Sequence, residues 1–260
     1  MRVRTSMKAW VLAALVVTPV LAMAQANTPV VAVLYFDNNS FGKDHGDFDG
    51  LGKGIADLLI NDMASNASMR IVERDRIQSI LQEQSLVQTK SIDPQTAVRL
   101  GKLLGAQYMI TGGFMSDGKG TLLVTSRVIN VETGAITNPV KLQSKGDDVL
   151  GLIGQLSTKL NTELKLPMRS ASIDRKPSAN VGEAPTDAKQ AGHQATTKQV
   201  ASTKPQKLDV KTALLYSKAL DEQDSGNPKK AAELYRAVLE KFPDFGPAQQ
   251  NLAKVQKSGH

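Results

Sequence analysis

The chain has 260 residues, a formal net charge of +7 and no cysteine. This length allows one or two domains, and the absence of cysteine excludes disulfides and a thiol nucleophile. The three histidines, at positions 45, 193 and 260, do not have the spacing of metal ligands. Aromatic residues do not interleave with the basic ones, so the composition argues against nucleic-acid binding.

The first 24 residues are typical of a secretory signal peptide. Arg2, Arg4 and Lys8 precede the apolar run AWVLAALVVTPVLA, and cleavage is expected between Ala24 and Gln25, after a small-x-small pattern. The apolar run is too short and wrongly flanked for a good membrane span, so a retained anchor is the weaker alternative. Cleavage removes three positive charges and leaves a mature chain of formal charge +4.

Apolar runs that read as strands alternate with helical periodicity between residues 30 and 166. This order predicts an α/β fold (an α+β sandwich) with a mixed sheet of about five strands flanked by helices. The expected strands span residues 30–36, 69–73, 107–114, 122–131 and 135–143. The expected helices span residues 51–63, run from about 73 to 86, follow residue 93, and begin at 147 or 148.

Local signals fix several boundaries. Asp93 is expected to cap a helix that begins at Pro94, and Gly105 to end that helix in a left-handed conformation. A tight turn is expected at Gly134, and Pro139 indicates an edge strand. In the helix over residues 51–63, the apolar spacing places Asp57 on or beside the face opposite the core.

The loop from Asp37 to Gly54 carries acidic residues, glycines and a histidine, but it fits no ion-binding motif. A calcium loop would put Ala56 where a bidentate glutamate is needed, and a phosphate loop would lack the Ser or Thr after Lys53. We therefore expect no metal site and no cofactor. The alternative is a metal-dependent enzyme that uses Asp44, His45, Asp47 and Asp49.

The segments AVLYF, RIVERDRIQSIL and LGKLLGAQYMITGGF resemble the CsgG family, over roughly Val30 to Leu164. The resemblance implies a periplasmic component of curli-type secretion or surface-structure assembly in a Gram-negative envelope. Members are often tethered by a lipid-modified cysteine, which this chain lacks, so we expect a periplasmic protein that is not a lipoprotein.

Pore-forming members of this family insert two long amphipathic hairpins. A spanning strand needs about 9–11 alternating residues, and the short turns expected here leave no room for such hairpins. We therefore expect no membrane span in the mature chain and no pore built by this protein alone.

Residues 167–207 lack aromatic residues and are expected to form a disordered linker. Residues 208–257 are expected to form a helical hairpin, followed by a short helix, that resembles a tetratricopeptide repeat. A single repeat is below the about three needed for an independent array, so it packs on the first domain, self-associates, or is completed by a partner. The positions that match the repeat are Ala219, Gly226, Ala231, Tyr235, Val238 and Pro243.

No catalytic constellation is visible, which predicts a non-enzymatic interaction protein of envelope biogenesis. Its expected partners are proteins of a secretion or appendage assembly complex, and a homo-oligomer is possible. The alternatives are a periplasmic activator of a peptidoglycan synthase and a homo-oligomeric transport-ring component. The candidate partner-contact residues are Glu73, Arg74, Tyr216 and Tyr235.

Overall fold

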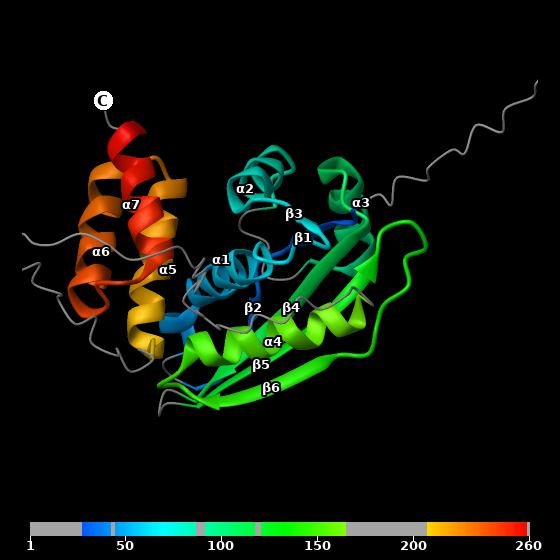
Figure 1. Cartoon of the computed structure of the whole chain (residues 1–260), viewed down its shortest axis with the longest axis horizontal. Coiled ribbons are helices and arrows are strands. Elements are labelled where there is room, and N and C mark those ends of the chain that lie inside the picture. The colour runs from blue at the N-terminus through cyan, green and yellow to red at the C-terminus, as the bar shows by residue number, and fades with distance from the viewer. Residues whose placement is uncertain (1–27, 43–44, 87–91, 118–120, 165–206, 259–260) are drawn as a thin grey trace, which may run out of the picture.

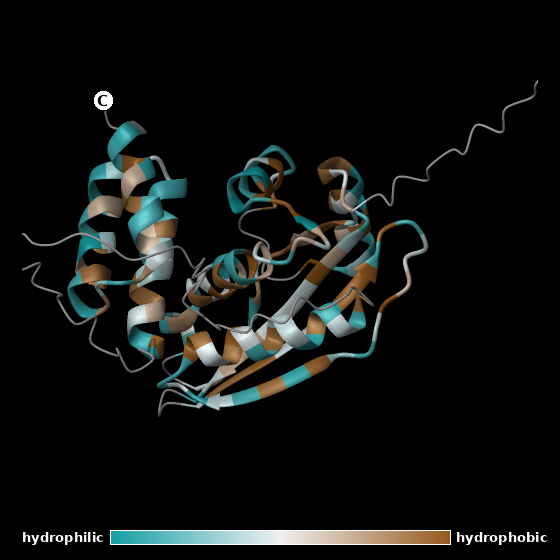
Figure 2. Ribbon diagram, viewed as in Figure 1, coloured by the Kyte–Doolittle hydropathy of each residue, from teal (hydrophilic) through white to brown (hydrophobic). Residues whose placement is uncertain are grey.

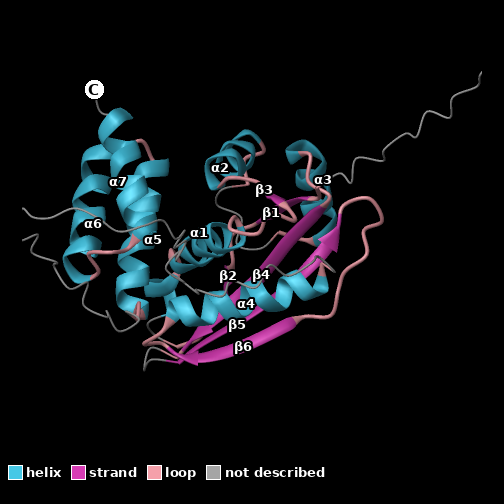
Figure 3. Ribbon diagram, viewed as in Figure 1, coloured by secondary structure: helices cyan, strands magenta, loops and turns pink. Residues whose placement is uncertain are grey.

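The structure is a computed structural model that describes residues 28–42, 45–86, 92–117, 121–164 and 207–258. The expected signal peptide, and all but the last residue of the expected linker, lie outside these ranges. Figure 1 shows the arrangement of the elements and Figure 3 their types. In chain order they are β1 (Val30–Val33), β2 (Asp37–Asn38), a 3-10 helix (His45–Phe48), α1 (Leu51–Met63), β3 (Arg70–Ile71), α2 (Arg74–Glu83), α3 (Pro94–Leu104), β4 (Tyr108–Ser116), β5 (Thr121–Asn130), β6 (Val140–Lys145), α4 (Val149–Glu163), α5 (Val210–Asp224), α6 (Pro228–Lys241) and α7 (Gly246–Ser258).

The described strands form one mixed sheet, which confirms the predicted fold class. Their order is β3-β1-β4-β5-β6, and the short β2 also pairs with β4. Strand β1 runs parallel to β3 and β4, whereas β5 and β6 continue from β4 in antiparallel fashion. In Figure 2 apolar residues dominate the central strands and alternate with polar ones along the edge strand β6.

Helices cover both faces of the sheet. Helix α1 lies on the face of the sheet to which the Phe114 side chain points. A Cβ atom added at Gly52 of α1 would come within 3.4 Å of the Phe114 ring. Helix α3 lies on the opposite face, where a Cβ atom added at Gly101 would come within 3.0 Å of Met109. Strand β1 is therefore buried on both sides, which explains its continuous apolar run.

The local signals at turns and caps are confirmed. The carboxylate of Asp93 accepts hydrogen bonds from the backbone of Gln95 and Thr96 at 2.9 and 3.0 Å. Hydrogen bonds from Thr96 lower the pKa of Asp93. Gly105 and Gly134 have φ angles of +66° and +71°, which favour glycine over residues with a Cβ.

Some strands are shorter than predicted. The first run divides into β1 and β2, because between them the N–H of Phe36 bonds to the carbonyl of Gly52 in α1 (3.2 Å). The second strand ends at Ile71, because α2 begins three residues later. The last strand begins only at Val140, after Pro139, and lies at the sheet edge as expected.

The C-terminal helices α5, α6 and α7 pack side by side, and α5 also packs against α1 (Figure 1). Backbone hydrogen bonds join their entry to the start of α4: Val149 N–H to Leu208 (2.8 Å) and Val210 N–H to Gly146 (2.9 Å). Of the three possibilities for this segment, the structure shows packing on the first domain. None of the described helices combines the length and the apolarity needed to cross a bilayer.

Candidate functional site at the junction of α1, α2 and α7

Helix α1 is buried on two sides, which corrects the prediction for Asp57. This residue is 4% exposed, because α5 covers the side of α1 that the apolar spacing leaves out. A Cβ atom added at Gly54 would clash with the hydroxyl of Ser217 and lie 3.2 Å from its Cβ. Glycine at position 54 therefore allows the two helices to approach each other.

Arg74, the first residue of α2, is the centre of a buried ion-pair network. Its Nη1 donates hydrogen bonds to both carboxylate oxygens of Asp224 in α5, at 2.6 and 2.7 Å. Its Nη2 donates to Asp75 at 2.7 Å, and its Nε lies 3.4 Å from Asp57 Oδ1. Burial opposes the charge of Arg74, but the charge and hydrogen bonds of Asp224 outweigh it and raise the pKa of the guanidinium.

Lys53 extends this network between α1 and α5. Its ammonium group lies 2.6 Å from Asp221 and 2.8 Å from Asp224. The same group stands 5.3 Å from the ring centre of Tyr35, within the range of a cation–π contact. Asp224 therefore binds two cations of the first domain, and α5 is held by charge as well as by apolar packing.

Asp57 starts a chain of hydrogen bonds that reaches α7. Its Oδ2 accepts from the hydroxyl of Tyr216 at 2.5 Å and from the amide of Asn61 at 3.0 Å. The Tyr216 oxygen in turn accepts from Asn251 at 2.9 Å. Burial raises the pKa of the Asp57 carboxyl and that of the Tyr216 hydroxyl, because it disfavours the charged form of both.

Asp57 should make the stability depend on pH in a definite direction. Folding raises its pKa above the ordinary value of 3.8, so its contribution is full below that pH and is lost as the pH rises through the raised pKa. The Asp57→Asn variant cannot ionise. Relative to the unmodified protein, the variant should therefore be more stable, with a higher free energy of unfolding, at about pH 7 than at about pH 4.

Urea unfolding of the full chain at both pH values measures this difference. The control variant Asp62→Asn removes an exposed carboxylate from the same helix. Its difference in free energy of unfolding from the unmodified protein should be the same at both pH values. A pH-independent difference for Asp57→Asn would contradict the assignment.

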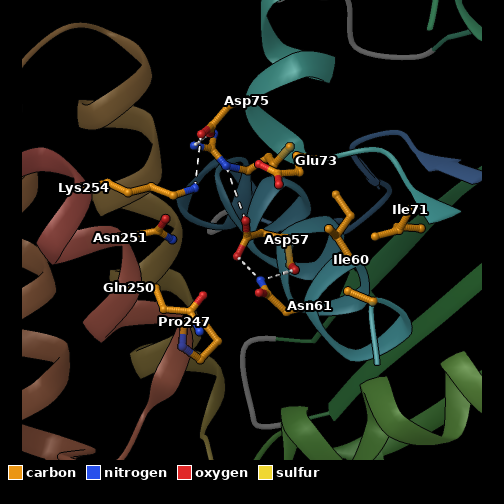
Figure 4. Close-up of a pocket in the computed structure, with 12 residues that line it drawn as sticks. Asp57, Ile60, Asn61, Ile71, Glu73, Asp75, Pro247, Gln250, Asn251 and Lys254 are labelled. Carbon is orange, nitrogen blue, oxygen red and sulfur yellow. Dashed lines mark hydrogen bonds and ion pairs between the residues drawn. The ribbon is translucent and has the colours of Figure 1, made fainter. Parts of the chain in front are cut away.

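A pocket of about 320 Å³ opens where α1, the start of α2 and α7 meet (Figure 4). Figure 4 shows Asp57 and Asn61 reaching into it from α1, facing Pro247 and Gln250 of α7. At one end Lys254 of α7 pairs with a carboxylate of α2 across 3.3 Å. The C-terminal helices thus complete a cavity that the first domain does not form alone.

The four predicted contact residues occupy different environments. Glu73 is exposed and lines the pocket, whereas Arg74 is 4% exposed. Tyr216 and Tyr235 are fully buried, with ring centres 5.9 Å apart, and the Tyr235 hydroxyl donates to Gln223 at 2.7 Å. Arg74 and Tyr216 thus join the first domain to the C-terminal helices, and Tyr235 joins α6 to α5. A partner contact by the four residues stays a prediction.

Sequence reasoning missed the residues that complete the network. Asp224, Lys53 and Asn251 come from three helices, two of them far along the chain. The only indication of the network in the sequence was that two polar residues, Ser217 and Asn251, stand at helical positions that are otherwise apolar and buried.

The loop before α1 shows no metal centre among its described residues. The side-chain amide of Asn38 donates to the carbonyl of His45 at 2.7 Å and to the carboxylate of Asp49 at 2.8 Å. Across the described residues, no three His, Asp or Glu side chains are grouped to hold a metal. Asp44, one of the four alternative ligands, lies outside the described residues.

Residues 17–117 match the family described as curli production assembly/transport component CsgG, which confirms the predicted resemblance. The LpoB C-terminal domain from Salmonella enterica is 16% identical, with a TM-score of 0.33, and the match covers 45% of this chain and 83% of that one. The PelC dodecamer from Paraburkholderia phytofirmans is 14% identical, with a TM-score of 0.34, over 54% of this chain and 89% of that one. No curated protein matches the sequence. The tetratricopeptide-like repeat stays a prediction.

Proposed function

We propose that this protein is a non-enzymatic interaction protein of envelope biogenesis that acts in the periplasm and assembles with a secretion or surface-appendage complex. The observation that carries the proposal is the match of residues 17–117 to the curli assembly and transport family. The signal-peptide pattern before Gln25 supports export.

The interaction surface in this proposal is the rim of the pocket where α7 meets α1 and α2. Because Arg74 and Asp224 join α5 to the first domain, the C-terminal helices act as part of one surface. The exposed groups Glu73 and Gln250 stand on the two sides of the pocket and are available to a partner.

In-cell photo-crosslinking of the full chain tests the proposal. A photoreactive residue at Gln250 places the probe on the pocket rim, and one at Lys159, an exposed position of α4, is the matched control. Both positions are exposed, so neither substitution should disturb the fold. We expect crosslinks from position 250 to components of a secretion or appendage complex, identified by mass spectrometry, and fewer from position 159.

Other products would change the proposal. A crosslinked peptidoglycan synthase would replace the assembly role with the activator role, and adducts between copies of this chain alone would favour a homo-oligomeric ring. Products that are only cytoplasmic, or none at either position, would contradict the proposal.

A further inference from the structure

The two asparagines that line the pocket use amide nitrogens in hydrogen bonds within the protein and leave their carbonyl oxygens as acceptors. The carboxylate of Asp57 can only accept, so Asn61 must direct its amide nitrogen there and present its carbonyl oxygen elsewhere. Tyr216 donates to Asp57, so Asn251 must direct its own nitrogen to the Tyr216 oxygen. Neither side-chain carbonyl accepts a hydrogen bond from a described residue, and Asn251 is only 7% exposed.

The charges of the pocket also favour a cation as its occupant. Three carboxylates and two cations line it, which gives a formal charge of −1. The guanidinium of Arg74 is used by Asp224 and Asp75, and Lys254 pairs with Asp75. Glu73 has no ion-pair partner within the described part of the chain, so a negative charge remains available on the rim.

An anion is the less suitable occupant, even though the N-terminus of α2 faces the pocket. Glu73 holds the N-cap position of that helix without a capping hydrogen bond from its side chain, and Asp75 lies in the first turn, so two carboxylates already lie near the positive end of the helix dipole. An incoming anion would also meet Asp57, whose charge is poorly solvated. Ile60 and Ile71 on one side and Pro247 of α7 on the other add apolar surface to the lining.

We propose that this pocket binds a guanidinium or primary ammonium group carried on a short aliphatic stem. The cation would pair with Glu73 and donate to the carbonyl oxygens of Asn61 and Asn251, while the stem contacts the apolar side chains of the lining. Such a group belongs either to an arginine or lysine side chain of a protein partner or to a free organic amine. The first source rests on the proposed function.

An NMR titration of the full mature chain with butylguanidinium or butylammonium chloride tests the pocket directly. We expect saturable shifts for amides of α1 and α7 around the pocket, and none with butanol, which has the stem but no charge. Glu73→Gln should weaken binding by about tenfold or more, because it removes the charged partner of the cation. Glu83→Gln, an exposed carboxylate at the end of the same helix, should bind as the unmodified protein does.

The inference fails if neither cation gives saturable shifts at the pocket, or if Glu73→Gln binds as tightly as Glu83→Gln. Crosslinks from position 250 to envelope proteins would leave the proposed function standing in that case. Where the pocket binds the probe, loss of those crosslinks on adding butylguanidinium assigns the cation to a partner side chain. Persistence of the crosslinks assigns it to a free amine.

Discussion

Replacing Arg74 with methionine is expected to lower the free energy of unfolding by about 3–5 kcal/mol. The guanidinium is 4% exposed and makes two hydrogen bonds to Asp224, whose side chain is 9% exposed. Methionine fills similar space but leaves the carboxylates of Asp224 and Asp57 without this cation inside the protein. Removing one partner of a buried ion pair costs more than the pair itself contributes, because the remaining charge is no longer compensated.

Urea unfolding of the full chain measures this loss, and Arg76→Met is the matched control. Arg76 lies two residues further along α2 and is exposed, so its replacement should change stability by less than about 0.5 kcal/mol. Equal stability of the Arg74 and Arg76 variants would mean that the network contributes nothing net to the junction.

Replacing Gly54 with alanine is expected to destabilise the protein by about 1–3 kcal/mol, although alanine is the better helix former. The added Cβ would clash with the hydroxyl of Ser217, which would lose its hydrogen bond to Ala213 on turning away, and the Cβ of Ser217, 3.2 Å away, would still be too close, so α1 and α5 would have to shift. Because this contact holds the C-terminal helices on the first domain, proteolysis of α5 to α7 should also become faster. Chemical unfolding and limited proteolysis of the full chain measure the two effects.

Two further variants separate this clash from a general effect of alanine. A Cβ atom added at Gly154 of α4 would meet no atom within 4 Å apart from its chain neighbours and the adjacent backbone of its own helix, so Gly154→Ala should stabilise by about 0.5–1 kcal/mol. Ser217→Gly removes the two atoms closest to the new methyl, so it should cost less in the Gly54→Ala background than alone. Additive effects of the two substitutions would rule out the helix contact as the cause.

The fold was predictable where a few neighbouring residues decide it. The cap at Asp93, the left-handed Gly105 and the turn at Gly134 depend on local backbone chemistry, and the structure has all three. The apolar runs likewise predicted the mixed sheet. The hydrophobic pattern of each strand depends on whether helices cover one face of it or both.

The junction was not predictable, because its partners are distant in sequence. Asp57 and Tyr216 are 159 residues apart, and Arg74 and Asp224 are 150 apart. Helical periodicity placed Asp57 opposite the core, and it could not show that α5 would turn that side into a second interior face. Glu73, predicted as a contact residue from the family resemblance, lines the pocket together with Arg74 and is the exposed one of the four, and its contact with a partner stays a prediction.

These long separations also set an order for folding. Contacts between residues so far apart form late, because the chain must first close a large loop. During synthesis, α1 emerges with a carboxylate and an apolar side that find their partners only when α5 and α7 have followed. A chain that stops before α5 would keep both uncovered and would be a target for proteases. The junction therefore makes the survival of the first domain depend on synthesis of the last helices.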